Sequence, residues 1–203
     1  MSWTGLAGTW MTDVTSPYPA AATGPPFEVQ AWSPIDFERR VDELLRVYIT
    51  AMRYPDLSLD YRRPTWIDHS RRAGFTCLVA VDQQDAVVGL CYGYTGGAHQ
   101  WWNSEVRRGM TDAQIEYWLS SYRELTELHV RPDRQGARIG ETLLREFLAL
   151  ADEDIVLLST PEGENRAWRL YRRLGFRDVL RHHRFSGDPR PFAILGRTLP
   201  LAE

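Results

Sequence analysis

Several features that define other protein classes are missing from this chain of 203 residues. No apolar run approaches the roughly 20 residues that span a bilayer, and no internal repeat is present. Basic residues (24) and acidic residues (27) nearly balance, so the net charge of −3 provides no overall positive field that would attract nucleic acid. The N-terminus has neither the basic segment nor the long apolar core of a secretion signal. We therefore expect a cytoplasmic protein with neither a membrane nor a nucleic-acid partner.

Cysteine is scarce, because the chain contains only Cys77 and Cys91. Two cysteines do not make a disulfide framework, and no cluster of Cys and His has the spacing of a metal site. Both lie in apolar runs, residues 75–81 and 86–94, which flank a polar turn at residues 82–85. Such a pattern predicts an antiparallel hairpin that places the two cysteines opposite or nearly opposite each other. We interpret them as buried apolar thiols of a reduced protein without a metal.

The length suits one α/β domain with a sizeable core. Residues 1–26 are rich in small residues and proline and nearly lack charge, so we expect a loose N-terminal extension. Residues 27–203 then form a single domain, with an insertion at about 95–123. Residues 27–32 predict a first strand, and Ser33 caps a helix that continues to about residue 54. A polar loop over residues 55–63, a short helix over 64–72 and a helix over 111–122 complete this half.

A glycine- and arginine-rich joint at residues 130–140 is the most informative stretch. It connects an expected strand, residues 125–130, to an amphipathic helix over residues 139–151. The N-terminus of a helix carries about half a positive charge and presents free backbone N–H groups, which together bind phosphate. Three arginines add full charges at this joint: Arg131, Arg134 and Arg138. The alternative is a basic strand-to-helix turn without a ligand.

The segment after this helix continues the same pattern. Residues 155–158 are wholly apolar, as a parallel strand buried on both faces is, so strand, helix and strand form one βαβ unit. A further helix begins at Asn165, and Gly175 suits the left-handed position that ends it. Residues 176–185 and 192–199 supply two last strands.

Two motifs resemble the signatures of the GNAT superfamily of N-acetyltransferases. The stretch Gln135-Gly136-Ala137-Arg138-Ile139-Gly140 resembles the acetyl-CoA signature Q/R-x-x-G-x-G/A. Residues 165–176 resemble the second signature, which carries an Asn, a Tyr and a final Gly-Phe, and they follow at the usual distance. Arg138 stands where the signature usually has glycine; we expect this to be tolerated because a residue at the start of a helix does not need positive φ. The resemblance covers residues 27–199, apart from the insertion.

The resemblance implies a GNAT fold of the α/β (α+β) class. Its central twisted sheet is mixed but mostly antiparallel, has six or seven strands flanked by helices, and contains the βαβ unit that forms the acetyl-CoA cleft. It also implies an N-acetyltransferase that transfers the acetyl group of acetyl-CoA to a primary amine by direct attack. The residues that it assigns to acetyl-CoA are Leu128, His129, Val130, Gln135, Gly136, Ala137, Arg138, Ile139, Gly140, Glu141 and Asn165.

Three residues receive catalytic roles from the resemblance and from acid–base chemistry. The Val130 N–H is the expected donor to the thioester carbonyl. Tyr171 is the expected acid for the leaving thiolate, since a phenol with a pKa near 10 donates a proton without first being charged. Glu124, six residues before Val130, is the expected base. Glu127 has the opposite parity on the strand, so only one of the two carboxylates is expected to face the cleft, unless a bulge reverses this.

The acceptor is less defined by the sequence. Five aromatic residues are candidates for its walls, and three acids are candidates for receiving its ammonium group: Tyr92, Tyr94, Trp101, Trp102 and Trp118, with Glu105, Asp112 and Glu116. The same aromatic residues also suit a core or a homodimer face. A small amine, an amino acid, an antibiotic and a protein amine all remain open.

Two other functions compete with catalysis on an amine. A non-catalytic acyl-CoA sensor or structural module on the same fold is compatible with arginine at position 138. A dinucleotide-binding oxidoreductase is disfavoured, because the loop is not G-x-G-x-x-G and no acidic ribose ligand ends a following strand.

Overall fold

The computed structural model describes residues 27–56, 58–163 and 165–200, so the predicted extension 1–26 lies outside the described residues. All strands of the described chain belong to one sheet with the order β1-β2-β3-β4-β5-β7-β6. The strands are β1 (Glu28–Trp32), β2 (Thr76–Val81), β3 (Val87–Thr95), β4 (Tyr122–Val130), β5 (Ile155–Pro161), β6 (Arg177–His183) and β7 (Phe192–Thr198). Neighbouring strands are antiparallel except β4 and β5, which are parallel, so the predicted mixed sheet with one βαβ unit is confirmed.

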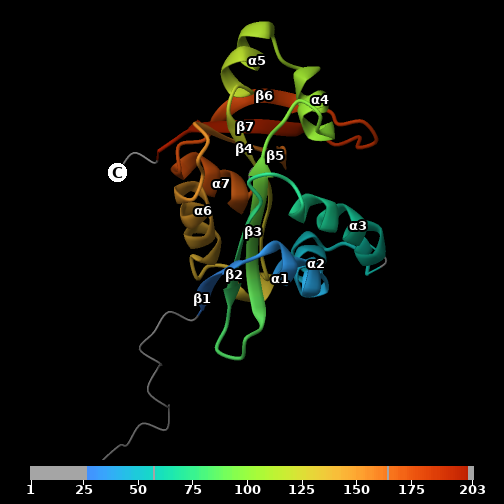
Figure 1. Cartoon of the computed structure of the whole chain (residues 1–203), viewed down its shortest axis with the longest axis vertical. Coiled ribbons are helices and arrows are strands. Elements are labelled where there is room, and N and C mark those ends of the chain that lie inside the picture. The colour runs from blue at the N-terminus through green and yellow to red at the C-terminus, as the bar shows by residue number, and fades with distance from the viewer. Residues whose placement is uncertain (1–26, 57, 164, 201–203) are drawn as a thin grey trace, which may run out of the picture.

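Helices cover both faces of this sheet (Figure 1). They are α1 (Pro34–Arg39), α2 (Val41–Met52), α3 (Ser58–Ser70), α4 (Trp101–Arg107), α5 (Asp112–Trp118), α6 (Ile139–Ala149) and α7 (Arg166–Arg173). A 3-10 turn, Pro132–Arg134, lies between β4 and α6. Among the described helices, none has both the length and the apolar character needed to cross a membrane.

Three apolar cores show which helices cover which part of the sheet. The first joins α6 and α7 to one face, with Leu143 and Phe147 fully buried at its centre. The second joins α1, α2 and α3 to the opposite face over β1–β3, around Phe37 and Trp66. The third lies on that same opposite face under α4 and α5, around Trp102. The helices of the opposite face therefore form two groups, one over each half of the sheet.

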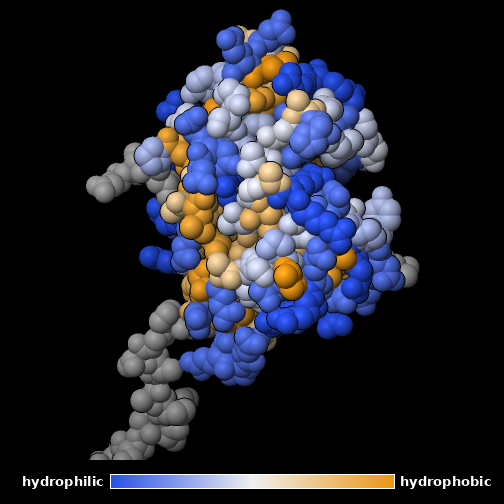
Figure 2. Space-filling model, in the orientation of Figure 1, coloured by the Kyte–Doolittle hydropathy of each residue, from blue (hydrophilic) through white to orange (hydrophobic). Residues whose placement is uncertain are grey.

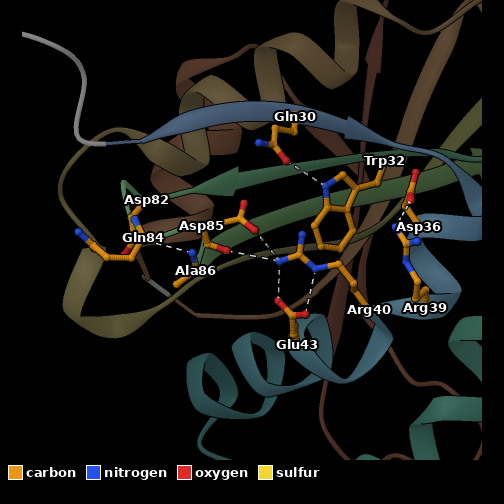
Figure 3. A network of polar contacts seen from close by, with 10 residues as sticks. All are labelled: Gln30, Trp32, Asp36, Arg39, Arg40, Glu43, Asp82, Gln84, Asp85 and Ala86. Carbon is orange, nitrogen blue, oxygen red and sulfur yellow. Dashed lines mark hydrogen bonds and ion pairs between the residues drawn. The ribbon is translucent and has the colours of Figure 1, made fainter.

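The expected helix from residue 33 to about 54 is instead two helices, α1 and α2, that meet at Arg40. The Arg40 backbone has φ −111°, which interrupts the helix. Its guanidinium binds both carboxylate oxygens of Glu43 at 2.9 and 2.8 Å, reaches the Asp85 carbonyl at 3.4 Å and lies 4.4 Å from the Trp32 ring centroid (Figure 3). These contacts tie the junction to β1 and to the β2–β3 turn, which compensates for the broken helix.

The second difference lies just after α2. Residues 58–63, expected as a loop, are the first half of α3, and Pro64 lies inside this helix rather than at its start. A proline inside a helix removes one backbone hydrogen bond, so local propensity argues against this structure. Tertiary packing outweighs it, because Trp66 is almost fully buried in the second core between α2 and β3.

Candidate active site

The centre of the sheet opens where β4 and β5 diverge. Their parallel pairing includes only Tyr122–Glu124 on β4 and the facing residues 155–157 on β5. β4 continues to Val130, paired with β3 on its other side. Within the described residues, no strand pairs with β4 on the β5 side beyond Glu124, so this edge keeps free backbone groups. Glu124 therefore stands at the point where the two strands separate.

The free edge presents backbone groups of alternate residues. The Arg131 N–H continues the β3–β4 ladder by donating to the Val88 carbonyl at 2.9 Å. Because successive residues of a strand point their N–H and C=O groups to opposite sides, Val130 and Leu128 must point into the cleft. The Gln135 side chain agrees with this, since its Nε2 donates to the Val130 carbonyl at 3.1 Å from the cleft side. Val130 and Leu128 therefore present their backbone groups on the free edge of β4.

Apolar side chains accompany this edge. Leu128 and Val130 on β4 and Ala167, Trp168 and Leu170 on α7 are partly buried and pack on the first core. Figure 2 shows apolar residues gathered over α6 on a face that is otherwise mostly hydrophilic. The cleft between β4 and α7 therefore combines free hydrogen-bonding groups with apolar walls, which suits an extended ligand with amide groups.

The strand register overturns the expectation that Glu124 and Glu127 face opposite ways. Glu124 pairs with Tyr94 and Glu127 pairs with Tyr92, and the register shifts between these two pairs because Thr126 is an extra residue in β4. Directly paired residues share a face, and Tyr92 and Tyr94 are two residues apart on β3. A β-bulge has therefore placed both carboxylates on the face that α1–α3 cover.

Glu124 is the most perturbed carboxyl of the site. It is only 4% exposed, and burial raises its pKa to about 8, although the Tyr94 hydroxyl and the Arg72 cation act in the opposite direction. The Tyr94 hydroxyl donates to Oε1 of Glu124 at 3.2 Å. The other oxygen, Oε2, is buried without a hydrogen-bond partner among the described residues. Glu124 thus has one oxygen oriented by Tyr94 and one buried oxygen without a partner among the described residues, and its pKa lies close to neutral pH.

Glu127 has a different environment on the same face. One of its oxygens lies 2.6 Å from Nε2 of His129, and the His129 ring packs edge-on against Tyr48 at 4.9 Å. The predicted ligand-binding residue His129 therefore points its side chain away from the cleft and pairs with Glu127. Glu127 is already engaged by a partner, whereas Glu124 keeps a free oxygen.

The loop before α6 adopts left-handed backbone at two positions. Gly136 has φ +96°, and Arg138, the residue that caps α6, has φ +62°. The expectation that position 138 avoids positive φ is therefore wrong. A left-handed residue with a side chain costs about 1 kcal/mol, which explains why the family signature favours glycine there.

Only one of the three loop arginines remains without an acidic partner in the described structure. Arg131 pairs with Asp133 at 2.8 Å, and Arg134 pairs with Asp82 at 2.9 Å. The Arg138 side chain is exposed and forms no ion pair with any described residue. It is the cation of this loop that is available to an anion.

The start of α6 leaves room for a ligand near its backbone. Ile139 is buried in the first core and fixes the helix, while Gln135, Gly136 and Ala137 are exposed. A Cβ added at Gly140 would meet only Val130 Cγ2 at 3.5 Å and Leu170 Cδ2 at 3.9 Å, which are ordinary contacts. The Glu141 carboxylate is held by Arg145 and Arg173 at 3.0 and 2.7 Å, so its charge is compensated. The loop and the helix N-terminus therefore leave exposed backbone and compensated side-chain charge at the position where the sequence predicts a phosphate site.

The second motif places its two predicted residues on α7. Asn165 is the N-cap of α7, and its side chain accepts a hydrogen bond from the Trp168 N–H at 3.0 Å. Tyr171 is 7% exposed and lies in the first core beside Phe176. Burial raises the pKa of Tyr171 above its ordinary value, and the neighbouring Cys91 and Glu127 raise it further. Its phenol is therefore fully protonated at neutral pH.

The insertion has a largely structural role. Trp102 is buried in the third core, and its Nε1 donates to Ser159 Oγ at 3.2 Å. Glu105 accepts from the Ser186 N–H at 2.7 Å and pairs with Arg108, so it anchors the β6–β7 loop instead of receiving an ammonium. Trp101 is 57% exposed at the surface. These three candidates thus have separate surroundings in the described structure, namely the third core, the β6–β7 loop and the surface.

Sequence reasoning missed the part of the site that α3 supplies. His69 Nδ1 lies 3.2 Å from the Tyr92 hydroxyl, and the Arg72 guanidinium lies 4.6 Å from the Tyr94 ring centroid. Neither belongs to a motif, and both are more than 50 residues from Glu124 in the sequence, so no local signal indicates them. No group of three or more potential metal ligands occurs among the described residues.

Comparison with known proteins identifies the family. The profile of the acetyltransferase (GNAT) family matches residues 41–176. A GCN5-like protein acetyltransferase of Mycobacterium tuberculosis is 48% identical over 197 residues, which cover 83% of this chain and 96% of the relative. The chain belongs to the GNAT family of acetyltransferases. It is accordingly an acyltransferase that uses acetyl-CoA, and the resemblance of its two motifs is confirmed.

Solved structures confirm that this is the GNAT fold. A GNAT-family protein from Desulfovibrio desulfuricans matches with a TM-score of 0.60 at 17% identity, over 84% of this chain and 99% of the other. An acetyltransferase from Salmonella typhimurium, solved with its cofactor acetyl-CoA, matches with a TM-score of 0.58 at 15% identity, over 86% and 95%. An N-acetyltransferase from Thermoplasma acidophilum, solved with coenzyme A, matches with a TM-score of 0.56 at 14% identity, over 85% and 99%.

Proposed function

We propose that this GNAT protein is an N-acetyltransferase that transfers the acetyl group of acetyl-CoA to a primary amine by direct attack. The observation that carries the proposal is Glu124, a buried carboxyl at the point where β4 and β5 separate, which has a pKa of about 8 and an Oε2 without a partner among the described residues. A general base is most effective when its pKa lies near the working pH. We assign the catalytic domain to residues 27–203, because the single sheet runs through the described part of that range.

The residues around the cleft fit acetyl-CoA. The free edge of β4 offers N–H groups of Leu128 and Val130 to a pantetheine arm, and the loop from Gln135 to Glu141 offers N–H groups to a pyrophosphate. Arg138 supplies an available cation at that loop. Bound acetyl-CoA supplies the thioester carbon that the amine attacks. Asn165 contributes by capping α7, which holds Tyr171 in place.

Spacing along β4 refines which N–H polarises the thioester carbonyl. Val130 lies six residues from Glu124, about 20 Å along an extended strand, which is far for a base that serves the same amine. Leu128 lies only four residues away, about 13 Å, and the bulge at Thr126 shortens this further. We therefore assign the Leu128 N–H to the carbonyl oxygen and the Val130 N–H to the adjoining arm.

Each of three residues then has one role in the transfer. Glu124 accepts a proton from the amine, directly or through one water, and the amine nitrogen forms its bond to the acetyl carbon. The Leu128 N–H stabilises the negative charge that develops on the carbonyl oxygen. As the C–S bond breaks, Tyr171 donates its proton to the thiolate sulfur. Tyr171 is protonated at neutral pH before each turnover; the phenolate that remains takes up a proton from solvent, and Glu124 releases the proton that it accepted.

We further propose that the acceptor is a protein amine. The support is the relative from Mycobacterium tuberculosis, which is named a protein acetyltransferase and is similar over nearly its whole length. The composition of the chain helps the test, because all 24 residues counted as Lys or Arg are arginine and none is lysine. Any acetyl-lysine formed in a reaction mixture must therefore belong to the added substrate.

The test incubates the full chain with acetyl-CoA and peptide pools that carry either an internal lysine or a free N-terminus, and it measures thiol release and peptide mass. We expect acetylated peptide with wild type and at least about 10²-fold less with Glu124→Gln. Glu28→Gln, the same change at an exposed position of β1, is the matched control and should retain full activity. Acetyl-CoA binding by calorimetry without thiol release from any peptide or small amine would favour the sensor alternative instead.

A further inference from the structure

The wall behind Glu124 is built by a turn that is remote in sequence. The turn after α3, residues 71–74, is fastened to the end of β3 by a hydrogen bond from the Thr95 N–H to the Ala73 carbonyl at 2.9 Å. Gly74 is required in this turn, because it has φ +66° and a Cβ there would approach Thr95 Oγ1 to 2.0 Å. This attachment holds Arg72 beside Tyr94, the neighbour of Thr95.

The contacts form a chain that ends on the carboxylate. Arg72 stacks on the Tyr94 ring at 4.6 Å and is steadied by Asp68 at 3.0 Å. The Tyr94 hydroxyl reaches Oε1 of Glu124 at 3.2 Å, which leaves Oε2 free. A buried carboxylate is stabilised by a hydrogen-bond donor and by a nearby cation, so both neighbours favour its ionised form.

We propose that Tyr94 and Arg72 are positioning residues for Glu124: the Tyr94 hydroxyl orients the carboxylate, and the Arg72 cation across the Tyr94 ring sets how much of it is ionised at neutral pH. The proposal rests on the assignment of Glu124 as the base. It adds the α3 turn, which no motif of the chain contains, to the machinery that controls the reaction. Neither residue touches the reacting atoms.

The groups that face Glu124 from each packed element decide the direction of the effect. They are Tyr92 and Tyr94 on β3, Tyr122 and Glu127 on β4, and His69 and Arg72 from α3 and its turn, whereas β5 places only Leu157 opposite. Burial lowers the pKa of His69 to about 4, so this ring is uncharged at neutral pH. Glu127 opposes ionisation of Glu124, and Arg72 is the neighbouring cation that favours it.

The experiment follows the ionisation of Glu124 directly and through the rate. Difference infrared spectra against Glu124→Gln isolate the protonated carboxyl band of Glu124 as pH rises, and pH profiles of kcat/KM use acetyl-CoA with one lysine-containing peptide. Since a base acts only when ionised, a raised pKa moves the rise of the rate to higher pH. We expect this midpoint to move upward by about one pH unit in Tyr94→Phe and by less in Arg72→Met.

Two matched controls separate these effects from general damage. Tyr122→Phe removes a buried hydroxyl that binds Asn103 at 2.9 Å rather than Glu124, and Arg71→Met removes a neighbouring charge that pairs with Glu38 on the surface. Both control variants should leave the midpoint of the pH profile unchanged. Arg72→Lys keeps a cation, so its midpoint should lie closer to that of wild type than the midpoint of Arg72→Met does. In a Glu124→Gln background, neither Tyr94→Phe nor Arg72→Met should change the pH profile.

The outcomes distinguish this inference from the proposed function. If Glu124→Gln reduces the rate but Tyr94→Phe and Arg72→Met leave the infrared and kinetic midpoints in place, the positioning role is overturned and the base assignment stands. If the infrared midpoint moves as expected but no peptide or amine is acetylated, the positioning role stands and the proposed function fails.

Discussion

Glu124→Gln should stabilise the folded protein while it reduces activity. The change keeps the shape of the side chain and its acceptor oxygen for the Tyr94 hydroxyl, but it removes a carboxyl that must lose its proton in a buried site. Glu124 is 4% exposed, and its Oε2 has no partner among the described residues, so little in the fold compensates its negative charge. The proposed base therefore makes folding less favourable.

The magnitude follows from the pKa. Burial raises the pKa of Glu124 from 4.5 to about 8, and each pKa unit corresponds to 1.36 kcal/mol, so the ionised form is disfavoured by roughly 5 kcal/mol as an upper bound. Below pH 4.5, the pKa of Glu124 in the unfolded chain, Glu124 is protonated in both the folded and the unfolded wild type, so its ionisation does not lower the free energy of unfolding. As pH rises from 4.5 to about 8, the unfolded state has released the proton and the folded state has not, so wild-type stability falls. Above that window the loss is complete and constant.

The assay is urea unfolding of wild type and Glu124→Gln between about pH 5 and pH 9, which compares two proteins at each pH. The difference in unfolding free energy should grow in favour of Glu124→Gln across this range and then level off. Glu116→Gln, an exposed acid, should show no such growth. A difference that stays flat with pH, or that favours wild type more at high pH, would refute the argument that Glu124 is protonated in the folded state at neutral pH.

Three further predictions concern the cofactor cleft. Arg138→Gly and Arg138→Asn both accept left-handed backbone and both lose the cation. Calorimetry should therefore show acetyl-CoA binding weakened by roughly 1–3 kcal/mol in each variant. Arg138→Gly should also be more stable to unfolding by about 1 kcal/mol. Gly140→Asp should abolish acetyl-CoA binding. Gly140→Ala should bind acetyl-CoA normally, because its Cβ makes only ordinary contacts, to Val130 Cγ2 at 3.5 Å and Leu170 Cδ2 at 3.9 Å. Equal binding by the two variants would contradict the proposal that the start of α6 binds the phosphate. Tyr171→Phe should lower kcat about 10²-fold without changing acetyl-CoA affinity; an unchanged kcat would reassign the acid.

The sequence predicts most of the fold because local and global signals agree there. The βαβ unit of β4, α6 and β5, the hairpin of β2 and β3, and the helix cap at Ser33 are all found. The two cysteines also agree, since Cys77 pairs with Tyr92 and Leu78 pairs with Cys91, so the thiols lie one residue out of register in separate cores. Periodicity and capping indicate such features because they depend on neighbours in sequence.

The failures share one physical cause, which is that distant contacts outweigh local preference. Arg40 breaks a continuous helical pattern because Glu43, Trp32 and Asp85 bind its side chain. Pro64 lies inside α3 because the second core accepts Trp66. Arg138 adopts positive φ because the loop must turn into α6 at that residue, whatever its side chain prefers. The contacts that decide these features include groups that a local pattern does not contain.

The bulge in β4 is the clearest link between such a contact and function. Gly93 on β3 lies beside the extra residue Thr126, and a Cβ at Gly93 would approach the Glu124 carbonyl to 1.9 Å, so only glycine lets the two strands close at this point. The resulting shift brings Glu124 to the face where Tyr94 can bind it, next to the point where β4 leaves β5. Strict alternation would have placed Glu124 with the residues that face α6. The glycine and the extra residue together therefore set which face of the sheet carries the proposed base, and a reading by parity alone fails because it counts residues instead of paired positions.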